Sequence, residues 1–159
     1  MRITVQKKLF KVKGFTLIEL LIVIAILGIL AAAVLVAINP GKRTRQAQDA
    51  KRKNDIGSLA TELQAYYTTP GAGCYPTALT TLVTLSYIKQ MPLDPTTTAA
   101  YNYLTSANSA GCAVPGGPTE FSLYATLAEP TGVAPRLWCY QSTSGIAQET
   151  ATTAPGCTP

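Results

Sequence analysis

The chain has 159 residues, a formal net charge of +5 and no histidine. The lack of histidine excludes His-based acid–base catalysis and histidine metal ligands. The first 14 residues hold five basic residues and no acid, and the rest of the chain carries eight basic and eight acidic residues. The excess positive charge therefore belongs to the N-terminal segment, and it is a weak indication of nucleic-acid binding.

An apolar run of 19 residues, 20–38, contains no charged or strongly polar side chain. A helix of roughly 20 apolar residues spans a bilayer core of about 30 Å. A secretory signal has a shorter apolar region that ends in a small-residue cleavage site, whereas this run ends in Asn39-Pro40-Gly41. The run therefore predicts a transmembrane helix. An uncleaved anchor is the simplest alternative, but it leaves Glu19 unexplained.

Glu19 lies near the start of this otherwise apolar segment. A carboxylate in lipid costs a few kcal/mol unless it reaches the headgroups or is paired. One interpretation is that Glu19 only reaches the headgroups from the end of the helix. The other is that it has a function that depends on a positively charged partner.

The residues around Glu19 resemble the processing site of type IV pilins and type II secretion pseudopilins: Lys13-Gly14-Phe15-Thr16-Leu17-Ile18-Glu19. The resemblance implies that a prepilin peptidase cleaves after Gly14 and that the new terminal amine of Phe15 is methylated. It also implies that Glu19 pairs with the terminal amine of a neighbouring subunit in a growing filament. A glutamate near a helix N-terminus is well placed to compensate such an amine and the positive end of the helix dipole.

Helical periodicity continues beyond the apolar run, with apolar residues at steps of three to four: Ile56, Leu59, Leu63 and Tyr66. One long helix is predicted over residues 15–67, and its amphipathic second half is expected to pack against a sheet. Gly28, Pro40 and Gly41 are candidate positions for a bend or local unwinding in a filament. For Gly28, close packing between helices is an equally strong alternative.

Six basic side chains lie within residues 42–53, directly after the apolar run. Three interpretations are open, in decreasing order of preference. The stretch is a solvated or headgroup-facing helix surface, it pairs with acids such as Glu62 in a filament, or it contacts DNA. The basic flanks on the two sides of the apolar run are too similar to decide the orientation in a membrane. The family resemblance places the leader in the cytoplasm.

Residues 70–159 are predicted to form the head. Residues 78–88 have the apolar side of a short helix, and Met91-Pro92-Leu93-Asp94-Pro95 resembles the loop that joins helix to sheet in pseudopilins and related pilins. Alternating patterns bounded by Pro and Gly turns predict an antiparallel three-stranded meander over residues 101–105, 121–127 and 137–142. The predicted fold class is α+β, a long helix packed on a small antiparallel sheet, as in the pilin fold. The Ser/Thr-rich tail, residues 143–159, is not expected to build a core.

Four cysteines follow the apolar run, and none forms a C-x-x-C pair: Cys74, Cys112, Cys139 and Cys157. This spacing argues against a zinc or redox motif and suits disulfides outside the cytoplasm. Three connectivities are possible, and we favour Cys74 with Cys112 and Cys139 with Cys157. The alternative is that some of these cysteines are buried free thiols.

Four segments are expected: a cleaved leader (1–14), the membrane or filament-core half of the helix (15–41), its amphipathic half (42–69) and the head (70–159). The resemblance implies a subunit that polymerises into a type IV pilus-like filament for adhesion or motility. The alternative is a pseudopilin of a type II secretion or DNA-uptake machine. Major pseudopilins usually place an aromatic residue and a glycine where this chain has Thr96-Thr97-Thr98, and this difference favours the pilus.

The resemblance also implies the partners: copies of the chain in a helical filament, a prepilin peptidase, the inner-membrane assembly machinery and, before assembly, membrane lipid. A nucleic acid is the least favoured partner. The protein is expected to cross the membrane once with an extracytoplasmic head and then to enter a cell-surface filament. The sequence has no nucleophile–base pair, phosphate loop or metal-ligand cluster, so neither an enzyme nor a cofactor is expected.

Overall fold

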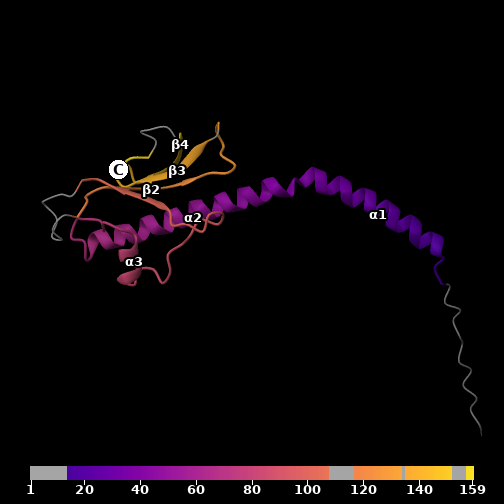
Figure 1. The fold of residues 1–159 in the computed structure, drawn as a ribbon, viewed down its shortest axis with the longest axis horizontal. Coiled ribbons are helices and arrows are strands. Elements are labelled where there is room, and N and C mark those ends of the chain that lie inside the picture. The colour runs from indigo at the N-terminus through magenta and orange to yellow at the C-terminus, as the bar shows by residue number, and fades with distance from the viewer. Residues whose placement is uncertain (1–13, 108–116, 134, 152–156) are drawn as a thin grey trace, which may run out of the picture. The chain divides into compact units, whose positions relative to one another are not determined.

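The computed structural model describes residues 14–107, 117–133, 135–151 and 157–159. The helices are α1 (Leu17–Ile38), α2 (Pro40–Thr68) and α3 (Thr80–Thr84). The strands are β1 (Asn102–Thr105), β2 (Phe121–Thr126), β3 (Arg136–Gln141) and β4 (Ile146–Ala151) (Figure 1). The chain forms two compact units, one ending at Pro40 and the other beginning at Gly41. The predicted α+β class is confirmed.

The expected single helix over residues 15–67 is interrupted at Asn39. This residue has a φ of 46°, in the left-handed region, and it separates α1 from α2. Pro40, the first residue of α2, lacks an N–H group to donate to the preceding turn, and it disfavours helical geometry in the residue before it. Asparagine tolerates the left-handed conformation better than most residues do. The break therefore follows from the Asn39-Pro40 pair.

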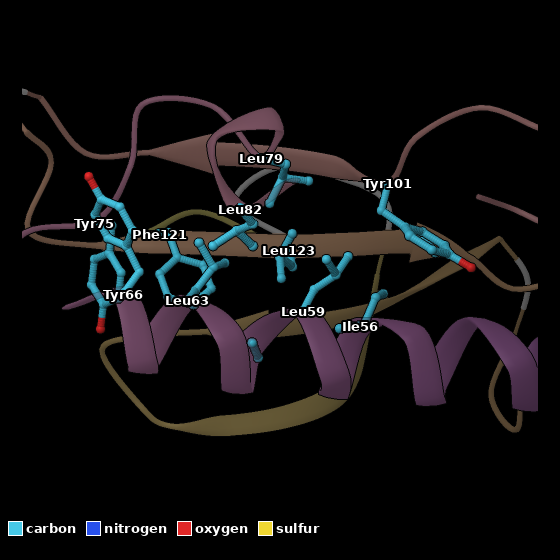
Figure 2. Packing of buried hydrophobic residues seen from close by; sticks show 12 residues of the cluster. Ile56, Leu59, Leu63, Tyr66, Tyr75, Leu79, Leu82, Tyr101, Phe121 and Leu123 are labelled. Carbon is cyan, nitrogen blue, oxygen red and sulfur yellow. The ribbon is translucent and has the colours of Figure 1, made fainter. Parts of the chain in front are cut away.

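The amphipathic face of α2 packs on the sheet, as predicted. The side chains of Ile56, Leu59 and Leu63 point toward β2 (Figure 2), and all three are at most 1% exposed. Phe121 and Leu123 of β2 meet them and are fully buried. The rest of the core comes from α2, α3, β2 and the segments beside the sheet: Ala60, Tyr66, Tyr75, Leu79, Leu82, Tyr101 and Ala125.

The connection after α2 depends on close backbone packing. At Gly71 a Cβ atom would collide with the backbone carbonyl oxygen of Cys74, so only glycine fits. Further along, α3 is shorter than the predicted residues 78–88 because Ser86 adopts a φ of 62°, which ends the helix. Leu82 of α3 still reaches the core with no exposed surface.

The sheet is a four-stranded antiparallel meander in the order β1-β2-β3-β4, and the prediction of three strands is wrong. The additional strand, β4, forms from the segment predicted to be a tail. Its side chains are exposed or half-buried, so its sequence lacks the apolar alternation of a core strand. Gly145, with a φ of 66°, permits the tight turn that pairs β4 with β3.

Glu149 anchors β4 to the loop between β2 and β3. Its carboxylate accepts hydrogen bonds from the Thr131 hydroxyl at 2.6 Å and from the N–H groups of Thr131 and Gly132 at 3.2 and 3.1 Å. The Arg136 guanidinium lies 3.1 Å from the same carboxylate. Led by the Thr131 hydroxyl, these groups lower the pKa of Glu149 to about 2.

The chain end is tethered to the sheet by a disulfide between Cys139 and Cys157, the pairing expected for these two residues. The Ser122 hydroxyl donates to the Cys157 carbonyl at 3.2 Å, and the Gln141 amide donates to the Thr158 carbonyl at 2.6 Å. Cys74 is buried, and its expected partner, Cys112, lies outside the described residues.

Leu63→Ala should lower the free energy of unfolding by about 2–5 kcal/mol, because it leaves a cavity between α2 and β2. The measurement is urea unfolding of the full chain in detergent, followed by the fluorescence of Trp138, the one tryptophan in the sequence. The control is Val133→Ala at a side chain that is 89% exposed, where we expect a change within about 0.5 kcal/mol. Equal effects in the two variants would contradict the packing described above.

The depressed pKa of Glu149 predicts a loss of stability in acid. In the folded protein the pKa of Glu149 is about 2, below the usual 4.5. The contribution of Glu149 to the free energy of unfolding is therefore complete above pH 4.5 and is lost as the pH falls toward 2. Thermal unfolding between pH 5 and 2 should therefore show a smaller decrease in Tm for Glu149→Gln than for the wild type. Identical pH profiles would rule out this role.

Candidate functional site

The N-terminal site comprises Gly14, Phe15, Thr16 and Glu19, at the start of α1. The Thr16 hydroxyl accepts the backbone N–H of Glu19 at 3.2 Å. In return, Oε2 of Glu19 accepts the backbone N–H and the hydroxyl of Thr16, both at 2.8 Å. This reciprocal capping box satisfies N–H groups that a helix start leaves without partners. It also holds the Glu19 carboxylate against the first turn of α1.

The peptide bond between Gly14 and Phe15 is accessible. The Phe15 side chain is 89% exposed, and a Cβ atom at Gly14 would meet no heavy atom within 4 Å. Thr16 has an extended backbone, with φ −81° and ψ 153°. A cut at this bond would therefore create an amine one residue before Thr16, close in sequence to the carboxylate that the capping box positions.

The surface of α1 is apolar on every side. None of its residues is buried in the chain, and by length and composition it is the one helix in the described segments able to cross a membrane. Its 22 residues span about 33 Å, close to the bilayer core of about 30 Å. So much exposed apolar surface is stable only when lipid or other protein surrounds it.

The three candidate bend residues lie in different places. The helix runs without interruption through Gly28, where a Cβ atom would have no heavy atom within 4 Å. Pro40 and Gly41 are the first two residues of α2. A bend at any of them in a filament stays a prediction, and so does close helix packing at Gly28.

A buried polar cluster holds the start of α2 in the head. The Arg52 side chain is 6% exposed, and its guanidinium donates to Asp49 at 2.7 Å, to the two oxygens of Asp94 at 2.6 and 3.1 Å, and to the Thr96 hydroxyl at 2.8 Å. The Arg52 guanidinium holds the pKa of the Asp94 carboxyl well below its usual range. The preferred interpretation of residues 42–53, a solvated or headgroup-facing helix surface, is therefore wrong for Arg52.

Asp49 connects the same cluster to the loop after β2. Its carboxylate accepts the backbone N–H of Ala128 at 2.9 and 3.1 Å and that of Glu129 at 2.7 Å. Asp49 and Arg52 precede Ile56 on the buried face of α2, in steps of three and four. This continuation of the apolar periodicity into charged residues is the sequence signal that could have revealed the cluster.

Three more basic side chains of α2 also contact the head. Arg45 pairs with Glu129 at 2.6 Å, and Lys51 pairs with Asp55 at 2.6 Å and donates to the Leu93 carbonyl at 3.1 Å. The Lys53 ammonium lies 4.5 Å from the centre of the Trp138 ring, a cation–π contact. Pairing within the chain thus accounts for much of the basic stretch. Within the described residues, no group of three or more Cys, Asp or Glu could hold a metal ion.

Comparison with known proteins supports the N-terminal site. A family model described as the prokaryotic N-terminal methylation motif matches residues 9–35. The matched range includes Gly14, Phe15 and Glu19. No curated protein and no solved structure matches the chain.

Arg52→Met should destabilise the head by about 3–5 kcal/mol, because it removes one partner of a buried ion pair and leaves two carboxylates uncompensated. The matched control is Arg43→Met on the exposed surface of the same helix, with an expected change within about 0.5 kcal/mol. Urea unfolding of both full-length variants measures the difference. If Arg52→Met unfolded at the same urea concentration as the control, Arg52 would not hold the head on α2.

Proposed function

We propose that this chain, which carries the prepilin-type signal of type IV pilins and pseudopilins, is a structural subunit of a type IV pilus-like surface filament. Its chemistry is assembly, and it catalyses no reaction. The observation that carries the proposal is α1, an apolar helix with no buried residue that begins two residues after an accessible Gly14–Phe15 bond. The filament would serve adhesion or motility.

Processing is the first step of the proposed function. A prepilin peptidase removes residues 1–14, and the amine of Phe15 is methylated. The methylation motif over residues 9–35 supports this step, and so does the exposure of Phe15. The mature chain then begins with a cation one residue before the capping box.

Membrane insertion precedes assembly. α1 crosses the bilayer once, and the head, with its Cys139–Cys157 disulfide, lies outside the cytoplasm, where disulfides persist. Lipid covers the apolar surface of α1 at this stage. In the filament the α1 helices of other copies take the place of lipid, so the apolar surface stays out of water throughout.

Glu19 selects the assembled state. In an isolated subunit its carboxylate is held by Thr16 of the same chain. A carboxylate in an apolar environment is far more stable when an opposite charge is near. We infer that the amine of a neighbouring Phe15 provides this charge and that inner-membrane machinery adds each subunit where the pair can form.

Glu19→Ala should leave processing and membrane insertion intact and reduce filament yield roughly tenfold or more, since a hydrogen bond to a charged group is worth about 1.5–3 kcal/mol. N-terminal mass spectrometry of the membrane fraction checks processing, and immunoblots of sheared surface material measure filaments. Glu120→Ala, which removes a carboxylate from the head, is the control and should keep the wild-type yield. Abundant fibres from Glu19→Ala would overturn the proposed role.

Electron microscopy of sheared surface material distinguishes a pilus subunit from a pseudopilin. A pilus subunit is abundant in the fibres, whereas a pseudopilin of a secretion or DNA-uptake machine stays in the cell envelope. Mature protein that still begins at Met1 would contradict the processing step. The alternative, that α1 is an uncleaved membrane anchor, would then hold.

A further inference from the structure

Arg43 differs from four of the other basic residues of α2 in its contacts. Arg45, Lys51, Arg52 and Lys53 each contact an acid or an aromatic ring of the second unit. The Arg43 guanidinium is exposed, and it donates to the neutral Gln46 amide oxygen at 3.3 Å. In the part of the chain that the structure describes, Arg43 forms no ion pair.

The position of Arg43 in the chain fixes its distance from the membrane. It lies five residues after Ile38, the last residue of α1, and five residues span at most about 17 Å even when the chain is fully extended. The polar headgroup region on each side of a bilayer core is roughly 5–8 Å thick. If α1 spans the bilayer, chain connectivity keeps Lys42 and Arg43 close to the headgroup region.

The local backbone also favours an anion at this position. Lys42 and Arg43 lie in the first turn of α2, which contains no acidic residue. Cations there add to the positive end of the helix dipole. An anion outside the chain would compensate the Arg43 guanidinium and the positive end of the helix dipole. An arginine guanidinium binds a phosphate through two parallel hydrogen bonds.

We propose that Arg43, with Lys42 beside it, binds the phosphate groups of anionic phospholipids on the extracytoplasmic side of the membrane before assembly. This inference rests on the proposed function, because it requires α1 to lie in the bilayer. Lipid is favoured over an acid of a second copy because it surrounds every unassembled subunit at this depth. Glu62, for comparison, lies 19 residues further along α2, on the order of 28 Å away along the helix axis, so pairing between copies needs a particular stagger.

The test uses the full chain in phosphatidylcholine nanodiscs with traces of spin-labelled phosphatidylglycerol or phosphatidylcholine. Electron paramagnetic resonance gives the relative association of the two lipids with the protein. We expect the wild type to prefer phosphatidylglycerol and Arg43→Gln to reduce this preference roughly fivefold, the equivalent of about 1 kcal/mol per cation at a membrane surface. The double variant Lys42→Gln/Arg43→Gln should come close to no preference.

Lys89→Gln is the matched control, because Lys89 is also exposed but lies in the head, and it should keep the wild-type preference. Raising the salt concentration should weaken the wild-type preference, because the interaction is electrostatic. A wild type without preference, or an Arg43→Gln variant that retains it, would overturn the inference. Loss of filaments in Arg43→Gln with an unchanged lipid preference would also overturn it and would assign Arg43 to contacts between copies.

Failure of the proposed function would appear in different measurements. Processing before Phe15 and fibres in sheared material report on the filament, whereas the spin-label preference reports on lipid binding. A wild type that shows the preference but forms no fibres would retain the lipid site and reject the filament. If processed wild-type protein formed fibres but showed no preference for phosphatidylglycerol, the filament would be retained and the lipid site rejected.

Discussion

The structure depends on one constraint: a 22-residue apolar helix, α1, has no buried residue within its own chain. Burying apolar surface is worth roughly 25 cal/mol per Å², so this helix is stable only in lipid or among other apolar helices. The head therefore cannot rely on α1 for its own stability. Its core is complete without α1, since α2, α3, the sheet and the segments that connect them supply every residue of the buried cluster. The Asn39-Pro40 pair marks the change from an apolar helix with no buried residue to the helix that packs in the head.

The face of α2 toward the sheet changes from charged to apolar along its length. Asp49 and Arg52 are as buried as the apolar residues that follow them, and they contact the Asp94 loop and the loop after β2. A buried ion pair often adds little net stability compared with apolar packing, but its geometry is specific. We infer that this cluster sets where along α2 the sheet is placed, while Leu63 and its neighbours provide most of the stabilising burial.

Features with a short sequence period could be predicted, and features that depend on distant partners could not. The apolar run, the buried face of α2 and the three strands nearest the core follow patterns of 3.6 or 2 residues. The processing motif could be recognised because Glu19 is an exception within an apolar segment. In contrast, Arg52 meets Asp94 across 42 residues and Asp49 meets Ala128 across 79. The helical period could place these two charges on the buried face of α2, but it could not identify their partners. β4 was not predicted because its sequence lacks apolar alternation. It is held instead by the contacts of Glu149 and by its backbone pairing with β3.

The arrangement of the sheet affects whether the edge strands of neighbouring heads can pair. Within the described strands, β1 and β4 each pair on one side only, and an unpaired strand can template the addition of another chain. β1 is short, with four residues. β4 is as long as its neighbour β3, but it carries a carboxylate fixed by the neighbouring loop. Short strands and charge discourage pairing between edges. In the proposed filament, heads brought side by side would thus stay separate domains instead of joining into one continuous sheet.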